Sequence, residues 1–419
     1  MDSKPGIDRR QFLWSIGSLS SMALLGDLGF AAETSKGMTA KANNAKVSVA
    51  WLPKGDTSYP LFKQMIEDAT DFKWLGKNDR ILIKLALNSA NPNPATTDPW
   101  ALDCLLKVLK EHGATKIFVG DQAGVRGVYW TAKGKVRGSS REFAQGAGLL
   151  EVIEKNGATP VFFEERGYDA YIATLPKGAQ SHWKEPMRVT SFVNEVDHII
   201  YAPRVGSHGF ADLTSGMKIG VGFLREDSRR VFHQGGANYY EMYEEINEVP
   251  EIKSKLRLVT SAGRYVMTLI GPDVGHIVEP PSAPIFASEN LLGHELFAYA
   301  FLQYTRKTMT PKEVAMPSLP AVGPGTLWEI QQNRTARNQG FLKFVWGLEP
   351  KDVPAFVNFN GETGIYKHPA IQNYIKFNRR PDINFQVKEI NQNTDSKAQG
   401  FMRQQLSVSR KQVEQLVKV

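Results

Sequence analysis

The sequence predicts an α/β fold with a doubly wound, mostly parallel β-sheet, helices on both of its faces and an irregular C-terminal section. Apolar runs of strand length recur along the chain, and helical patterns separate several of them, which is typical of successive βαβ units. The 419 residues, 42% hydrophobic and 22% charged, suffice for a large core and have the composition of a soluble globular protein. We therefore expect one large α/β domain.

Six strands are expected, each from a short apolar run. Runs of this length and composition, set between helical patterns, are typical of strands buried in a parallel sheet. The runs are KVSVAWL from Lys46, RILIKLAL from Arg80, KIFVGD from Lys116, TPVFFEE from Thr159, HIIYAPRV from His198 and LRLVTSA from Leu256.

The clearest helix is expected between Pro99 and His112. Asp98 suits the N-cap, Pro99 suits the first helical position, and Gly113 suits the position just beyond the end. Helical spacing of apolar residues gives this segment one face for packing on the sheet, formed by Leu102, Leu105, Leu106 and Leu109.

A second helix is expected to begin at a capping box formed by Ser139 and Glu142 and to end at Asn156-Gly157. Both helices lead into a strand through the same tripeptide, Gly-Ala-Thr, at 113–115 and at 157–159. Only two copies occur, so we interpret them as successive α–β turns of one sheet and not as a solenoid repeat.

The single cysteine, Cys104, limits the possible chemistry. One cysteine excludes an intramolecular disulfide, a multi-cysteine zinc site and an iron–sulfur cluster held by cysteines. Because Cys104 falls within the first helix, we interpret it as a small buried apolar residue; the alternative is a catalytic thiol.

The N-terminus has the features of an export signal. Asp8 to Trp14 read DRRQFLW, and a weakly apolar stretch follows, with small residues suited to cleavage around Ala31. The pattern resembles a twin-arginine signal peptide over residues 1–32, which implies the Tat translocon as partner and a periplasmic or otherwise exported protein. A cytoplasmic amphipathic N-terminus is the alternative. No later segment has the roughly 18 apolar residues of a membrane span.

Residues 46–305 are expected to form the α/β domain, and residues 306–419 a C-terminal extension packed on it. Loops and scattered helices are expected there, ending in a polar amphipathic helix from about Asn391 that covers the body or is mobile. The long, Gly-rich and basic loop from Ala123 to Ser140 is expected to have a functional role, because loops of this length are more often functional than accidental.

The formal net charge is +8. No run of Lys and Arg with interleaved aromatic residues is present, so nucleic acid is not an expected partner. The sequence also lacks the glycine-rich dinucleotide fingerprint, the Walker loop and the Gly-x-Ser-x-Gly elbow, which argues against dehydrogenases, P-loop NTPases and α/β-hydrolases. A small anionic ligand agrees with the mildly basic balance.

Polar residues follow three of the expected strands at their carboxyl ends. Asn88 follows the second strand, Asp121 ends the third, and His208 comes shortly after the fifth. Ligands of doubly wound sheets bind at these ends, so the three residues are candidates for one shared site. Each of them is, alternatively, a turn or cap residue.

Lys84 lies within an apolar strand, where a buried ammonium is unfavourable without a partner. If the strand is central, Lys84 is a candidate ligand-binding residue. If the strand lies at the edge of the sheet, Lys84 is a charge that opposes edge-to-edge aggregation.

The middle of the chain adds further basic groups. Arg204 and Lys218 are expected to bind anionic oxygens, and His208 or His233 to move a proton. Asp121 is expected to orient a histidine or to bind a metal. A divalent cation held by Asp121 and His208 is a weaker hypothesis, because the chain has no pair of histidines at metal-binding spacing.

Two further segments are candidates for backbone roles near a ligand. Gly271-Pro272-Asp273-Val274-Gly275 is typical of a tight turn. Ser288 is expected to cap a helix whose N-terminus either binds an anion or is a plain helix start.

Taken in order, these motifs resemble the domain-of-unknown-function 362 family over roughly residues 46 to 305. The opening matches at Lys84, Asn88-Ser89, Pro92, Thr96 to Pro99, Gly113-Ala114 and Val119 to Asp121. The later family motifs correspond to His208, Lys218, His233, Gly271 to Gly275 and Ser288 to Glu295. The resemblance implies the fold and the site more than a reaction.

This chain departs from the family pattern at several positions. Asn290 and Glu295 stand where the family has two aspartates, Ile219 follows Lys218 where the family has Asn, and the ferredoxin-like Cys clusters of many relatives are missing. The resulting hypothesis is an exported enzyme that acts on a small anionic molecule. The alternatives are a ligand-binding or cofactor-handling protein without catalysis and an accessory protein for another exported enzyme.

Overall fold

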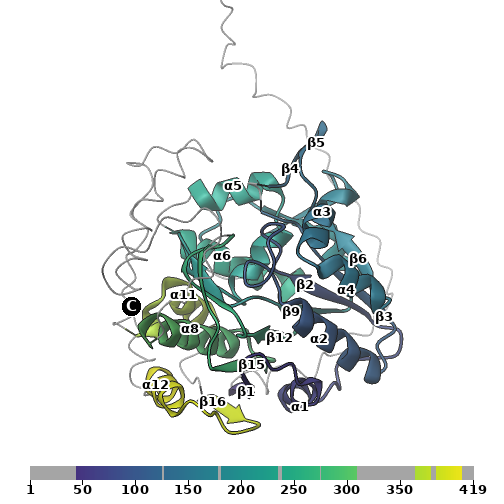
Figure 1. Cartoon of the computed structure of the whole chain (residues 1–419). Coiled ribbons are helices and arrows are strands. Elements are labelled where there is room, and N and C mark those ends of the chain that lie inside the picture. The colour runs from purple at the N-terminus through teal and green to yellow at the C-terminus, as the bar shows by residue number, and fades with distance from the viewer. Residues whose placement is uncertain are drawn as a thin grey trace, which may run out of the picture. The chain divides into compact units, whose positions relative to one another are not determined.

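The computed structural model describes residues 44–124, 127–177, 181–234, 238–273, 275–308, 364–378 and 384–407, all within one compact unit. The expected signal peptide lies outside the described residues. The main sheet has eight strands in the order β16-β1-β15-β12-β9-β2-β3-β6 (Figure 1). It contains all six expected strands, which are β1 (Asn44–Pro53), β2 (Arg80–Leu85), β3 (Lys116–Asp121), β6 (Thr159–Phe162), β9 (His198–Ala202) and β12 (Leu256–Ala262).

The mostly parallel, doubly wound sheet is confirmed. Strands β6, β3, β2, β9 and β12 run parallel to one another. Two strands were not foreseen from the sequence: β15 (Ser282–Ser288) runs antiparallel to both β1 and β12, and β16 (Asn384–Glu389) adds parallel to β1 at the edge. The C-terminal part of the chain therefore contributes to the main sheet.

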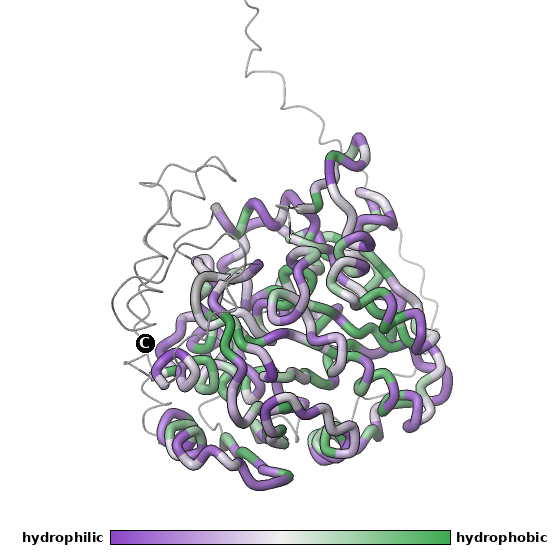
Figure 2. The backbone as a smooth tube through the Cα atoms, viewed as in Figure 1, coloured by the Kyte–Doolittle hydropathy of each residue, from purple (hydrophilic) through white to green (hydrophobic). Residues whose placement is uncertain are grey.

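Helices pack on both faces of the sheet, as expected. Neighbouring residues of a strand point to opposite faces. In β2, Ile81 and Ile83 join one core with α1 (Tyr59–Ala69) and α2 (Pro99–Glu111), whereas Leu82 joins the other core with α8 (Leu291–Thr308). Figure 2 shows the corresponding pattern, with apolar segments in the sheet and polar ones at the outer turns.

The α2 helix agrees with its sequence. Asp98 accepts a hydrogen bond from the backbone N–H of Trp100 as the N-cap, Gly113 follows the C-terminal end at φ +90°, and the four leucines of the predicted face are buried. Cys104 is buried on the same side, and burial raises the pKa of its thiol to about 12, which fits a core residue.

The second expected helix is two helices, so the prediction of one continuous helix is wrong. They are α3 (Ser140–Gly146), capped by Ser139 as expected, and α4 (Leu149–Lys155). Gly148 between them has a positive φ of +72°, a left-handed conformation that interrupts the helix and suits glycine.

A second, four-stranded sheet has the order β11-β10-β13-β14 and contains His208 at the end of one strand. Its strands are β10 (Gly206–His208), β11 (Asp212–Thr214), β13 (Val266–Ile270) and β14 (Gly275–Val278). Arg306 of α8 joins the elements of this sheet, because its guanidinium donates to the Asp212 carboxylate at 2.9 Å, to the Ser207 hydroxyl at 2.8 Å and to the Thr268 carbonyl at 3.0 Å.

The remaining elements are short. The Gly-rich loop after β3 contains the hairpin β4 (Tyr129–Thr131) and β5 (Gly134–Arg137), and a second hairpin pairs β7 (Tyr171–Thr174) with β8 (Met187–Thr190). The other helices are α5 (Glu226–Gln234), α6 (Tyr239–Glu245), α7 (Pro250–Lys253), α11 (Pro369–Phe377) and α12 (Ser396–Leu406), with 3₁₀ turns η2 (Phe163–Arg166), η3 (Ser191–Asn194), η4 (Lys218–Phe223), η6 (Ile246–Glu248) and η8 (Ile365–Lys367).

The expected C-terminal helix is present in part as α12, which begins after the N-cap Asp395. No helix among the described residues is both long enough and apolar enough to cross a membrane.

Candidate functional site

The chain reverses its winding direction between β2 and β9. After β2 it continues to the neighbouring strand β3, and after β9 it continues to β12 on the other side. Such a reversal leaves a crevice at the carboxyl ends of the two strands, where ligands of this fold class bind. Thr97 joins the two strand ends, because its hydroxyl accepts from the Ala86 N–H at 2.9 Å and donates to the Ala202 carbonyl at 2.6 Å.

A cavity of about 60 Å³ opens at this point of the sheet. Four of the predicted site residues line it, namely Asn88, Asp121, Arg204 and Lys218, and Arg229 lines it as well. The residues come from the segments that follow β2, β3 and β9 and from η4 and α5. The structure therefore brings distant parts of the sequence to one cavity.

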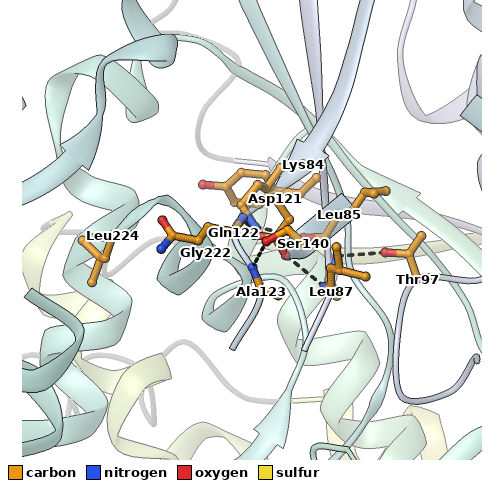
Figure 3. Close-up of polar contacts among 12 residues, drawn as sticks. Lys84, Leu85, Leu87, Thr97, Asp121, Gln122, Ala123, Ser140, Gly222 and Leu224 are labelled. Carbon is orange, nitrogen blue, oxygen red and sulfur yellow. Dashed lines mark hydrogen bonds and ion pairs between the residues drawn. The ribbon is translucent and has the colours of Figure 1, made fainter. Parts of the chain in front are cut away.

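Lys84 and Asp121 form a buried ion pair beside this cavity (Figure 3). Strand β2 is central, and the Lys84 side chain is fully buried, with Nζ 2.5 Å from Asp121 Oδ1 and 2.9 Å from the carbonyl oxygen of Leu85. Asp121 also accepts from the backbone N–H groups of Leu87 at 2.9 Å and Gln122 at 2.7 Å. Asp121 lines the cavity, whereas Lys84 does not.

The environment of this pair is tightly packed and of low polarity. Burial lowers the pKa of Lys84 and raises that of Asp121, and in each case the charge of the partner opposes the effect. The Lys84 ammonium lies 5.2 Å from the centre of the Phe223 ring. Gly222 packs directly against the pair, and a methyl group at this position would overlap with Asp121 Oδ1 and Lys84 Nζ.

Arg229 of α5 fixes two of the loops that form the cavity. Its guanidinium donates to the carbonyls of Gln122 at 2.8 Å and Ala123 at 2.5 Å, which follow β3. It also donates to the carbonyls of Leu224 at 2.9 Å and Gly222 at 3.2 Å. Sequence reasoning missed Arg229, because nothing in the local pattern distinguishes it from its neighbour Arg230.

Arg204 is 1% exposed. Its Nη1 donates to the carbonyl of Pro94 at 2.8 Å, but Nε and Nη2 have no hydrogen-bond partner among the described residues. Burial lowers the pKa of Arg204 to about 10, and the nearby Asp273 carboxylate opposes this shift, so the group is charged at neutral pH. Leaving a buried donor unpaired costs about 1–3 kcal/mol, which a bound anion would offset.

Lys218 begins η4 and is partly buried in the cavity wall. Desolvation, together with the charges of Arg204 and Arg229 and against the opposing charge of Asp273, lowers the pKa of its amine to about 7. The preceding loop is held by Glu295 of α8, whose carboxylate accepts from the Met217 N–H at 3.0 Å. Burial raises the pKa of Glu295 to about 7.

His208 and His233 lie close enough to the cavity to interact electrostatically with Lys218. Nδ1 of His208 accepts from the backbone N–H groups of Phe210 at 3.1 Å and Ala211 at 3.2 Å, which favours the tautomer with its proton on Nε2. Nδ1 of His233 lies 2.7 Å from the Arg229 carbonyl and is therefore the protonated nitrogen. Burial lowers the pKa of His208 well below its usual value and that of His233 to about 3.

Asp121 and His208 are the residues proposed to bind a metal. Both carboxylate oxygens of Asp121 and the Nδ1 atom of His208 accept hydrogen bonds within the protein, as described above. Within the described residues no group of three or more His, Cys, Asp or Glu side chains is arranged to hold a metal ion.

The expected turn at Gly271 packs against the His208 segment. Gly271 has a φ of +69°, and a side chain there would overlap with the carbonyl of Ser207. Asp273 of the same turn supplies the negative charge near Arg204 and Lys218, and its carbonyl accepts from the Asn91 amide at 2.9 Å.

The assignment of Ser288 as helix cap is wrong. The side chain of Asn290 accepts from the Gly293 N–H at 3.0 Å in α8, whereas Ser288 donates to the carbonyl of Lys46 at 2.5 Å. Asn290 suits this N-cap as well as aspartate does. The two departures from the family pattern, at Asn290 and Glu295, thus fall on residues that hold backbone and do not line the cavity.

Comparison with known proteins gives a family and a distant similarity to solved structures. No curated protein matches the chain. The lactate racemase apoprotein from Thermoanaerobacterium thermosaccharolyticum is similar in structure, at 14% sequence identity and a TM-score of 0.44, over 88% of this chain and 90% of that one. The model of the family described as "Domain of unknown function (DUF362)" matches residues 81–299, just over half of the chain and including the residues that line the cavity. The chain therefore belongs to the DUF362 family.

Proposed function

We propose that this protein is an enzyme that binds a small anionic molecule in the cavity between β2 and β9 and moves a proton on it. The observation that carries the proposal is the pairing of a fully buried, incompletely hydrogen-bonded guanidinium at Arg204 with the amine of Lys218 in the wall of one cavity. The first group binds the anion, and the second exchanges the proton.

The charges around the cavity support an anionic ligand. Lys84 and Asp121 neutralise each other. Arg204 and Arg229 remain charged, with Asp273 as the acidic group that acts on the Lys218 amine. This leaves an excess of positive charge in a buried place, where a charge-assisted hydrogen bond contributes about 1.5–3 kcal/mol.

Lys218 is the group of the cavity best suited to proton transfer. A general base is most effective when its pKa lies near the working pH, and the surroundings of Lys218 lower its pKa to about 7. The histidines were the expected proton carriers, but both are held neutral by burial.

A binding protein without catalysis is the second candidate. The hydrogen bonds of Asp121 favour it, because Lys84, Leu87 and Gln122 already donate to this carboxylate and hold it in place. In this case the same residues bind the anion, and the protonation of Lys218 only makes the affinity of the protein for the anion depend on pH.

The test is calorimetric titration of the purified full chain with small carboxylates and with phosphate, followed by NMR of each bound compound in D₂O. Binding together with deuterium incorporation next to the anionic group, lost in Lys218→Met, is expected for the enzyme. Binding without exchange would favour the second candidate. A complete lack of anion binding would refute the proposal, and metal analysis of the same sample tests the expected divalent cation.

Export is a separate part of the proposal and rests on the Arg9-Arg10 motif with its apolar continuation. Residues 1–40 fused to a folded reporter are expected to direct it to the periplasm. Replacement of both arginines by lysine should abolish this transport, and unchanged transport would show that the twin-arginine motif is not the signal.

A further inference from the structure

One edge of the buried Arg204 guanidinium has no hydrogen-bond partner among the described residues. Nη1 is used by the carbonyl of Pro94, and the two nitrogens without a partner among the described residues are Nε and Nη2. These two N–H groups are parallel and form the edge that receives two oxygens of one planar anion.

Elsewhere in this protein the same edge binds carboxylates. Arg141 donates from Nε and Nη2 to the two oxygens of Glu165 at 2.9 and 2.8 Å. Arg225 donates in the same way to the two oxygens of Asp227 at 3.1 and 2.7 Å. The edge of Arg204 that has no hydrogen-bond partner is thus the same edge that binds a carboxylate in Arg141 and Arg225.

The other buried arginines have no such edge. Three arginines are buried among the described residues, namely Arg204, Arg229 and Arg306. Nε and Nη2 of Arg229 donate to backbone carbonyls, and those of Arg306 donate to Thr268, Ser207 and Asp212. Burial alone therefore does not leave this edge without partners. Of the three arginines only Arg204 lacks them, and it lines the cavity together with Arg229.

The surrounding charges favour an anion with a single negative charge. Lys84 neutralises Asp121, and Asp273 lies near both Arg204 and Lys218. When the Lys218 amine is neutral, the positive charges of Arg204 and Arg229 exceed the negative charge of Asp273 by one, and a monoanion balances this excess.

The cavity also limits the size of the ligand. Its volume is about 60 Å³. A buried water needs about 10–15 Å³ of such space, so the cavity holds roughly four to six waters or an acid of roughly two to four carbons.

From this geometry we infer that the ligand is a small monocarboxylate, whose two oxygens receive the Nε–H and Nη2–H groups of Arg204 while its remaining carbons lie beside Lys218. The inference rests on the proposed anion site and specifies its ligand class. Arg204 then contributes orientation as well as charge, since a two-point contact fixes the plane of the carboxylate.

The experiment compares propanoate with its neutral counterpart propanamide and with inorganic phosphate, each titrated into the full chain by calorimetry. Propanoate is expected to bind and propanamide not to bind. Arg204→Lys keeps the charge but removes the two-point edge, so propanoate affinity should fall at least tenfold. Arg141→Lys makes the same change at the surface pair with Glu165 and should leave the affinity unchanged.

The possible results separate the two proposals. Binding of phosphate but not propanoate, or an Arg204→Lys variant with unchanged propanoate affinity, would overturn the carboxylate inference and leave the anion site standing. If neither anion binds, the proposed function fails as well. If Arg204→Lys does not fold, as judged by circular dichroism, the comparison of propanoate with propanamide on the unchanged protein decides.

Discussion

Lys84 and Asp121 are 37 residues apart in sequence and form an ion pair with Nζ 2.5 Å from Oδ1, in which the lysine side chain is 0% and the aspartate side chain 5% exposed. The parallel pairing of β2 with β3 produces this contact, because it places Lys84 opposite Gly120, next to Asp121. Glycine is required at position 120 for another reason, because a side chain there would overlap with the carbonyl of Val161 in β6.

Removal of one partner of this pair should destabilise the protein strongly. Lys84→Met leaves an uncompensated buried carboxylate, and such changes cost about 3–5 kcal/mol. Urea denaturation of Lys84→Met, Asp121→Asn and the double variant measures the coupling of the two residues. The exposed pair of Lys63 and Glu111 is the control, and Lys63→Met should have little effect. If Lys84→Met and Lys63→Met lower the free energy of unfolding equally, the buried pair contributes no more to stability than the exposed pair.

Gly222→Ala should disturb the same pair without changing any charge. The added methyl group overlaps with Asp121 and Lys84, and overpacking of this kind costs about 1–3 kcal/mol. Gly400→Ala in α12 is a matched control, since no atom lies within 4 Å of the added Cβ. Alanine at this helical position should stabilise by about 0.5–1 kcal/mol. The melting temperatures of the two variants should therefore shift in opposite directions from that of the unchanged protein.

Glu295 should make stability depend on pH in the acidic range. Its folded pKa is raised from 4.5 to about 7, so the folded state holds a proton that the unfolded state releases. Glu295 thus contributes on the order of 3 kcal/mol to the free energy of unfolding. This contribution is fully present below about pH 4.5 and is lost as pH rises to about 7. Glu295→Gln keeps an oxygen for the Met217 N–H and should flatten this slope. An unchanged slope between pH 4.5 and 7 would exclude Glu295 as its source.

Lys218 should link anion binding to proton uptake. Its pKa of about 7 should rise when an anion binds nearby, because the negative charge favours the ammonium over the neutral amine. Affinity for propanoate should thus be highest below pH 7 and decrease toward pH 9, with protons taken up on binding near pH 8. Calorimetry in two buffers of different ionisation enthalpy measures this uptake. Lys218→Met should abolish it, whereas Lys133→Met on the exposed β4–β5 turn should retain it.

Of the three residues expected at strand ends, Asn88 and Asp121 line the cavity, because parallel strands bring their carboxyl ends to one edge of the sheet, whereas His208 is not among the residues that line it. Arg229, Gly222 and Glu295 could not be foreseen, since each acts through backbone or side-chain atoms of segments that only folding brings near.

The sequence by itself determined the six main strands, the α2 helix with its caps and the order of the family motifs, because these depend on local apolar spacing and on residues close in the chain. The tertiary structure alone decided that β15 and β16 complete the sheet, that Lys84 pairs with Asp121, and that Arg204 keeps two N–H groups without a protein partner. The reason is physical: strand pairing, desolvation and the count of hydrogen-bond partners depend on which distant segments meet.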